Sequence, residues 1–217
     1  MRRGVLVGLF AALAAGTAAQ EPAAGGVPAG FRAYIVADDR YPAPAGADNK
    51  PGPADPRNRT SRMHDPVVEF GLDPVAAVFT RQAPAADAPV GKLLKRLDEL
   101  PVAHRKLQDR GKAVRAVRPF VVFLTLDKEY PEDDARDTKA GPVKELAAAL
   151  KTPRVVYGLA AGKSPQADAW KLGEAETVVV VYDRMQVVRR WEVPAGGPSD
   201  EVIGQVAEAA DTAAGAK

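Results

Sequence analysis

The stretch YGLAAGKS at residues 157–164 is the part of the chain closest to a known chemical motif. A phosphate-binding loop has the pattern G-x-x-x-x-G-K-[ST], in which backbone amides and a lysine surround the phosphates. Here only three residues separate Gly158 from Gly162, and Tyr157 stands where the loop needs its first glycine. Pro165 also removes an N–H from the helix that would follow. We therefore interpret this stretch as a turn between a strand and a helix.

The two histidines and three serines of the chain offer little further chemistry. His64 and Asp65 could form a metal-ligand pair, but no third ligand follows at a recognisable spacing, which favours a solvated loop. His104 lies in a segment rich in lysine and arginine, where we expect it to be exposed. None of the serines stands in a G-x-S-x-G motif. We expect no catalytic residue, no metal site and no cofactor.

An acidic segment over residues 127–137 is a further candidate. Its members are Asp127, Glu129, Glu132, Asp133, Asp134 and Asp137. They do not fit the calcium-loop pattern D-x-[DN]-x-[DN]-G. A solvated loop is the expected structure, and weak calcium binding stays open as the alternative.

The first 19 residues predict an exported protein. The chain begins with MRR, residues 4–15 are apolar and uncharged, and Thr17 and Ala19 suit the −3 and −1 positions of a cleavage site. This pattern is typical of a secretory signal peptide, and the apolar run is shorter than the roughly 20 residues of a membrane span. We expect cleavage to leave no membrane span, in a periplasmic, cell-surface or secreted protein; an uncleaved anchor is the alternative.

The charge of the chain gives no reason to expect nucleic acid as a partner. The sequence has 30 basic and 28 acidic residues, and the predicted signal holds two arginines and no acid, so the mature chain is formally neutral. Nucleic-acid binding depends on positive charge. One basic cluster stands out: Lys106, Arg110, Lys112, Arg115 and Arg118. A solvated helix face explains it equally well.

Apolar periodicity predicts the elements of the fold. Strands are expected near residues 31–36, 74–80, 120–126, 154–159, 177–182 and 187–193, and helices over 92–110, 141–150, 164–172 and from 199 onward. Pro101 should kink or split the first helix, and Gly141-Pro142 should open the second. Trp170, Tyr182 and Trp191 are expected in the core.

This order predicts one α/β domain with a mixed sheet. Strands alternating with helices favour parallel crossovers, and the last two strands form an antiparallel hairpin. We divide the chain into a signal (1–19), a Pro/Gly-rich linker and loop (20–62) in which 31–36 could form an edge strand, and the domain proper (63–217).

The order of elements resembles the thioredoxin fold. A strand–helix–strand unit is followed by a closing helix–strand–strand–helix, and the stretch ETVVVVYDRMQVVRRWEV looks like the family's final hairpin. An inserted helix and strand near 141–159 resemble the redoxin and peroxiredoxin-like branch. The resemblance covers residues 75–210 and implies a mixed sheet flanked by helices, with an inserted α-β unit.

The resemblance also implies where a redox site would lie. In the redox families a cysteine follows the first central strand, and a cis-proline precedes the closing hairpin. The corresponding stretches here read QAPAADAP (82–89) and GEAET (173–177), and the whole chain has no cysteine. Thiol–disulfide exchange and cysteine-based peroxide reduction need a thiolate and are therefore excluded.

A groove between these two stretches is the candidate binding site. We expect Gln82, Asp87, Glu174 and Thr177 to line it, with Thr177 offering a strand edge to an extended peptide. The acidic side chains favour a neutral or basic partner. The sequence thus favours an exported, redox-inactive module that binds a protein or peptide; the alternative is an enzyme with carboxylate- or metal-based chemistry.

Overall fold

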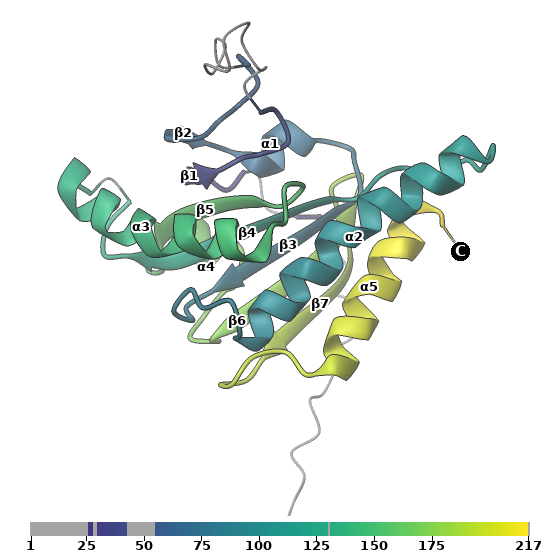
Figure 1. Cartoon of the computed structure of the whole chain (residues 1–217). Helices are drawn as coiled ribbons and strands as arrows, with labels where there is room; N and C mark the ends of the chain where they lie inside the picture. The colour runs from purple at the N-terminus through teal and green to yellow at the C-terminus, as the bar shows by residue number, and fades with distance from the viewer. Residues whose placement is uncertain (1–25, 28–29, 43–54, 130, 217) are drawn as a thin grey trace, which may run out of the picture.

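A computed structural model describes residues 26–27, 30–42, 55–129 and 131–216 of the chain. The predicted signal peptide and part of the predicted linker (residues 20–25, 28–29 and 43–54) lie outside the described residues. Within them, a seven-stranded sheet has the order β2-β1-β5-β4-β3-β6-β7 (Figure 1).

The centre of the sheet is parallel and its flanks are antiparallel. β3 (Val75–Thr80) pairs in parallel with β4 (Arg118–Leu126), which pairs in parallel with β5 (Val156–Ala161). On the other side of β3, β6 (Thr177–Asp183) runs antiparallel and forms a hairpin with β7 (Gln186–Val193). The predicted mixed sheet, with a thioredoxin-like arrangement and an inserted α-β unit, is confirmed.

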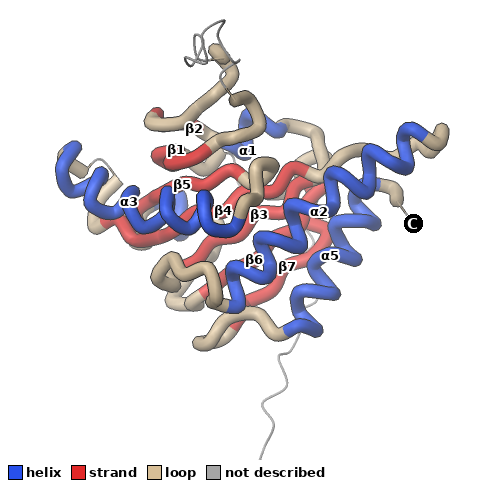
Figure 2. Tube along the Cα trace, in the orientation of Figure 1, coloured by secondary structure: helices blue, strands red, loops and turns tan. Residues whose placement is uncertain are grey.

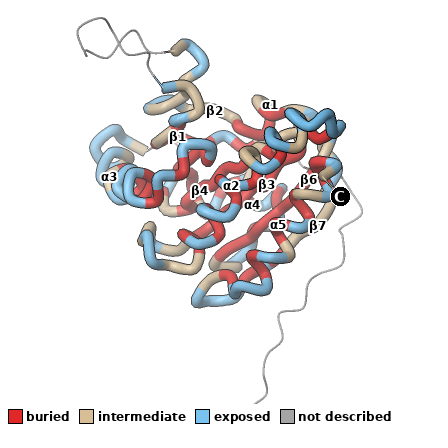
Figure 3. The backbone as a smooth tube through the Cα atoms, turned by 45° about the vertical axis from the view of Figure 1, so that its right-hand side comes forward, coloured by how far each residue is buried: buried red, intermediate tan, exposed pale blue. Residues whose placement is uncertain are grey.

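Helices cover both faces of this sheet (Figure 2). One face packs against α2 (Pro89–Asp109), α3 (Asp133–Leu150) and α5 (Asp200–Ala214). The other face packs against the short helices α1 (Pro66–Phe70) and α4 (Pro165–Ala169). Figure 3 shows the central strands as buried, as expected when both faces of a sheet are covered, whereas the edge strands β2 (Arg62–His64) and β7 are more exposed.

The residues of β3 show how the sheet divides the core. Ala76 and Val78 point into the cluster under α2 and α5, whereas Val75, Ala77 and Phe79 point to the opposite side. There Phe79 packs against Phe31, Phe120 and Trp170 at ring distances of 4.7, 5.9 and 5.1 Å. Trp170, Tyr182 and Trp191 are all buried, as predicted.

Local signals set several element ends as predicted. Ser164 and Ser199 cap α4 and α5 by accepting hydrogen bonds from the N–H groups of Ala167 and Val202. Arg184 and Met185 both have positive φ in the β6–β7 turn, the backbone shape of a two-residue hairpin connection.

Two helix predictions were wrong in detail. Of the kink or split predicted at Pro101, the split does not occur, because α2 continues through this residue. Its buried leucines pack the part before Pro101 against one sheet face, and the buried His104 holds the part after it to α5. α3 starts at Asp133, well before Gly141, so its first turns contain part of the segment predicted as an acidic loop. Carboxylates suit a helix N-terminus, where the backbone N–H groups carry partial positive charge.

His104 is buried, not exposed as predicted. Its side chain is 1% exposed, and its Nε2 lies 2.8 Å from Asp211 Oδ1 on α5. The basic residues around it in the sequence lie on the outer face of α2, whereas His104 faces α5. A helical segment rich in charge therefore still buries one polar position.

The N-terminal strands belong to the sheet. β1 (Ala33–Ala37) lies between β2 (Arg62–His64) and β5, so it is an inner strand and not the edge strand that we considered. Phe31 and Ile35 are almost fully buried. The domain boundary at residue 63 stays a prediction, and the position of β1 leads us to propose a domain that begins near Phe31.

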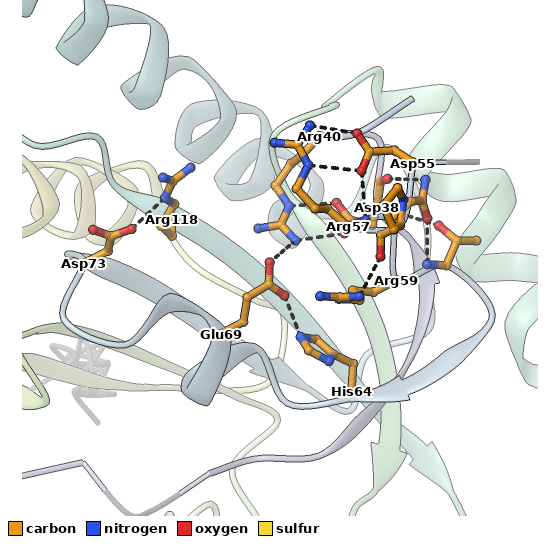
Figure 4. A network of polar contacts seen from close by, with 12 residues as sticks. Asp38, Arg40, Asp55, Arg57, Arg59, His64, Glu69, Asp73 and Arg118 are labelled. Atoms are coloured by element: carbon orange, nitrogen blue, oxygen red, sulfur yellow. Dashed lines mark hydrogen bonds and ion pairs between the residues drawn. The ribbon is translucent and has the colours of Figure 1, made fainter. Parts of the chain in front are cut away.

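A charged network ties this N-terminal part to α1 (Figure 4). Arg40 donates to both carboxylate oxygens of the buried Asp38, at 2.7 and 2.8 Å, and to Glu69 at 3.0 Å. Glu69 also contacts His64 Nε2 at 2.6 Å. Burial opposes the charge of Arg40, but the bonds to Asp38 and Glu69 outweigh it and raise the pKa of the guanidinium. His64 thus has a structural partner instead of the solvated position predicted for it.

Candidate functional site

The predicted site lies at the carboxyl edge of the sheet, where β3, β4 and β5 end and β6 begins. Open α/β sheets bind ligands beyond the carboxyl ends of their strands. The loop after β3 leads here into the start of α2, and the loop before β6 lies beside it, because Thr80 and Thr177 are register partners.

The four predicted groove residues fall into two groups. Asp87 and Glu174 are exposed, whereas Gln82 is half-buried and Thr177 is buried. The backbone N–H of Gln82 donates to Thr80 Oγ1 at 3.1 Å, and the hydroxyl oxygens of Thr80 and Thr177 lie 2.9 Å apart. The two predicted loops thus form this edge, but the buried Thr80 and Thr177 side chains fill the space between them.

The role predicted for Thr177 was wrong. We expected it to offer a free strand edge, but β6 is an inner strand that pairs with β3 on one side and β7 on the other. Thr177 faces Thr80 and Val193 in these two ladders. Its backbone is therefore not available to a peptide in that way.

Arg81 is the central residue of this edge, and the sequence analysis missed it. It directly follows β3, and its Nη2 donates to the carbonyl oxygens of Gly162, at 3.2 Å, and Gly173. Its backbone N–H donates to the carbonyl of Glu176 at 2.8 Å. The signal was available: a charged side chain stands immediately after a strand of mostly apolar residues, at the edge where open α/β sheets bind ligands.

A loop at residues 194–197, which we call the closing loop, covers the same edge. The N–H of Gly196 donates to Glu176 Oε2 at 2.9 Å. Gly197 lies so close to α2 that a Cβ there would meet Pro89 Cβ at 2.9 Å and Gln82 Nε2 at 3.0 Å. Gly196 and Gly197 have φ values of +99° and +86°, which glycine adopts without strain.

Two buried polar atoms at this edge have no hydrogen-bond partner within the described part of the chain. They are Arg81 Nε, a donor, and Gln82 Oε1, an acceptor. Buried polar atoms are nearly always paired in folded proteins, so each exception calls for an explanation. A peptide backbone offers both kinds of partner, a carbonyl and an N–H.

Other chemistry is not favoured by the described residues. No group of three or more histidine, aspartate or glutamate side chains there could hold a metal ion. In the same part of the chain, no helix combines the length and apolar character that crossing a membrane requires. Tyr157, at the start of the loop-like YGLAAGKS motif, is buried inside β5, so this stretch is a strand and a turn, as interpreted.

Comparison with known proteins gives similarity at the level of structure alone. No family model matches the chain, and no curated protein matches it significantly in sequence. Among solved structures, a secreted disulfide oxidoreductase of Mycobacterium tuberculosis homologous to E. coli DsbE is 14% identical, with a TM-score of 0.43 over 68% of this chain and 90% of that one.

Two further structures from the same organism are also similar. Peroxidoxin BcpB is 13% identical with a TM-score of 0.46, over 88% of this chain and 97% of that one. AhpC is 12% identical with a TM-score of 0.47, over 86% of this chain and 90% of that one. The mixed sheet and its flanking helices give the chain a thioredoxin-like fold, and the chain contains no cysteine.

Proposed function

We propose that this protein is an exported, redox-inactive thioredoxin-fold module that binds a protein or peptide at the carboxyl edge of its sheet. The observation that carries the proposal is the unpaired donor and acceptor, Arg81 Nε and Gln82 Oε1, at that edge. An extended peptide can satisfy both atoms through its backbone, as in other cases where a chain adds to a fold by main-chain hydrogen bonds.

Access to these atoms requires movement of the closing loop. The loop is held by one hydrogen bond from Gly196 to the half-buried Glu176 and contains two adjacent glycines. Loops with few buried contacts and high backbone freedom open at low free-energy cost. A partner would therefore displace residues 194–197 and replace the Glu176 contact with its own.

The exposed side chains at the rim determine the kind of partner. Asp87 and Glu174 are solvent-exposed on the two loops that flank the edge. Complementary charge across an interface favours encounter and specificity. We therefore propose a neutral or basic partner, met after export as the N-terminal sequence predicts.

A binding assay with a library of short, extended peptides tests this function. Reversing both rim charges, with Asp87→Lys and Glu174→Lys, should weaken binding of basic peptides by about 3- to 10-fold, the size expected for exposed charge pairs. Neutral peptides should lose little. The variant with Glu99→Lys and Glu145→Lys, two exposed acids on α2 and α3, is the matched control and should bind like the unmodified protein.

Two outcomes would count against the proposal. One is a library in which no peptide binds. The other is equal weakening by the rim variant and the control, which would place the interface elsewhere.

Insulin reduction and peroxide consumption with a dithiol donor should both equal the protein-free background, because the chain has no cysteine.

A further inference from the structure

A second feature lies at the opposite end of the sheet, the amino edge, where β3, β4 and β5 begin. An open cleft of about 610 Å³ lies there between the C-terminal half of α2 and the start of β4. Its size falls within the usual range of small-molecule sites, about 300–1,000 Å³. The charged residues that line it are Arg105, Lys106, Arg115, Arg118, Arg154 and Asp73. We call it the basic cleft.

The basic cleft gathers residues from four separate parts of the chain. Arg105 and Lys106 come from α2, Arg115 from the loop after it, Arg118 from β4 and Arg154 from the loop before β5. Three of them, Lys106, Arg115 and Arg118, belong to the basic cluster of the sequence, for which a solvated helix face was an equally good explanation. The tertiary structure instead brings them together around one hollow, and adds Arg154.

Ion pairs position two of the arginines from the protein side. Asp98 holds Arg154 at 2.9 Å and Asp183 holds Arg115 at 2.6 Å. Neither carboxylate lines the cleft, although both arginines do. Asp98 is 11% exposed against 44% for Arg154. Asp98 therefore holds Arg154 from the buried side. The Arg115 guanidinium is also bonded to the carbonyl oxygens of Leu72 and Ala213, so Arg115 adds positive charge beside the cleft but few free donors.

Nitrogen donors remain for a ligand after these pairs are formed. Arg118 Nε donates to Asp73 Oδ2 at 3.0 Å (Figure 4). This bond leaves Nη1 and Nη2 of Arg118 for a ligand. Arg154 uses Nη1 on Asp98, which leaves Nη2 and Nε. The planar guanidinium fork matches the oxygen pairs of carboxylates and phosphates. The lone lining carboxylate, Asp73, is neutralised by Arg118.

From this arrangement we propose that the basic cleft binds a small multivalent oxyanion, a phosphate ester or a polycarboxylate. More than one guanidinium can engage such an anion at once, and the volume admits a molecule up to about nucleotide size. The proposal does not depend on the peptide site, which lies at the other end of the sheet. A neutral mature chain with a concave, localised positive site suits a small anion better than a long polyanion.

Calorimetric titration with pyrophosphate and with citrate, each at low and at moderate salt, tests the proposal. At least one of the two should bind with one site per chain, and added salt should weaken it because screening reduces attraction between partly exposed charges. Tighter pyrophosphate binding would indicate a phosphate ester as the ligand, and tighter citrate binding a polycarboxylate. Acetate, with one charge, should bind much more weakly than either.

A pair of matched variants assigns the binding to the cleft. Lys106→Glu with Arg118→Gln should weaken binding more than 10-fold. Lys144→Glu with Arg96→Gln makes the same charge change at exposed positions of α3 and α2 and should leave binding within about twofold. Circular dichroism checks the fold, and the single change at the exposed Lys106 serves if the double variant unfolds.

Three results would overturn the proposal. The first is no binding of pyrophosphate or citrate by the unmodified protein. The second is equal weakening in both double variants. The third is tight binding of duplex DNA without binding of either small anion, which would make this surface a nucleic-acid contact instead.

Discussion

The two ends of the sheet differ in how they use arginine. At the carboxyl edge Arg81 turns inward and donates to backbone carbonyls of two other loops, and the closing loop covers it. At the amino edge Arg118 and Arg154 are about two-fifths exposed and line an open cleft. Arginine thus has a structural role at the carboxyl edge and lines an open cleft at the amino edge.

The two edges of the sheet therefore differ in how their polar groups are arranged. The carboxyl edge has a structural arginine, two unpaired polar atoms and a glycine loop within the described residues. The open, charged concavity lies at the other end. Stability measurements at matched positions can test whether the two ends differ as described.

The largest expected effect is at Arg81. Replacing it with alanine leaves two carbonyl oxygens without their donor and creates a void, which should lower the free energy of unfolding by about 2–4 kcal/mol. Arg118→Ala, the control at the open end, breaks an exposed ion pair and should cost about 0–1 kcal/mol. Urea unfolding of both variants measures the difference. Equal losses would mean that Arg81 does not seal the carboxyl edge.

Two glycines with similar backbone angles give a second comparison. The positive φ angles at Gly197 (+86°) and Gly111 (+76°) both favour glycine over other residues. A Cβ added at Gly111, however, would meet no other atom within 4 Å. Gly111→Ala should therefore cost only the backbone strain, about 1 kcal/mol. Gly197→Ala adds a collision with Pro89 and should cost about 2–3 kcal/mol.

Thermal unfolding of these two variants tests how tightly the closing loop packs. A Gly197→Ala variant as stable as Gly111→Ala would show that the loop already lies away from α2 in solution. That result would sharpen the proposed opening of the carboxyl edge, because the peptide site would then be accessible without a partner.

The amino edge should lose stability at alkaline pH. Burial raises the pKa of Tyr157, near the start of β5, to about 12, although its hydrogen bond with Thr152 lowers it in part. Unfolded tyrosine loses its proton near pH 10, so between pH 10 and 12 the unfolded state binds fewer protons and stability falls as pH rises.

Between pH 10 and 12, Tyr157 should lower the free energy of unfolding by about 1 kcal/mol for each pH unit. Burial also raises the pKa of Tyr182, which adds to the slope. Urea unfolding at pH 9, 10 and 11 measures the slope, and Tyr157→Phe should remove the share of Tyr157 alone. An unchanged slope in that variant would show that Tyr157 is not held neutral by the fold.

Local patterns predicted the elements but not always their surroundings. The hairpin of β6 and β7 and the serine caps followed from short-range signals and were confirmed. The predictions for the start of α3 and for the exposure of His104 were wrong. The length of a helix, and which of its faces packs against another element, depend on contacts with residues far away in the sequence. Asp211, the partner of His104, is 107 residues away.

The candidate site divides in the same way. Gln82, Asp87 and Glu174 were placed at the carboxyl edge because element order alone determines which loops meet there. The burial of Thr177, the contacts of Arg81 and the cover by residues 194–197 depend on the distances between loops, which no sequence spacing contains.

The sequence by itself determined that this protein has no thiol chemistry, because cysteine is a matter of composition and not of geometry. It also determined the mixed sheet, since apolar runs and turns fix the order of strands and helices. Only the tertiary structure decided that β1 is an inner strand, that Arg81 bonds to the loops at the carboxyl edge, and that basic residues from α2, β4 and two loops surround one cleft. The physical reason is that pairing and charge clustering join segments many residues apart, whose contact energies appear only once the chain is folded.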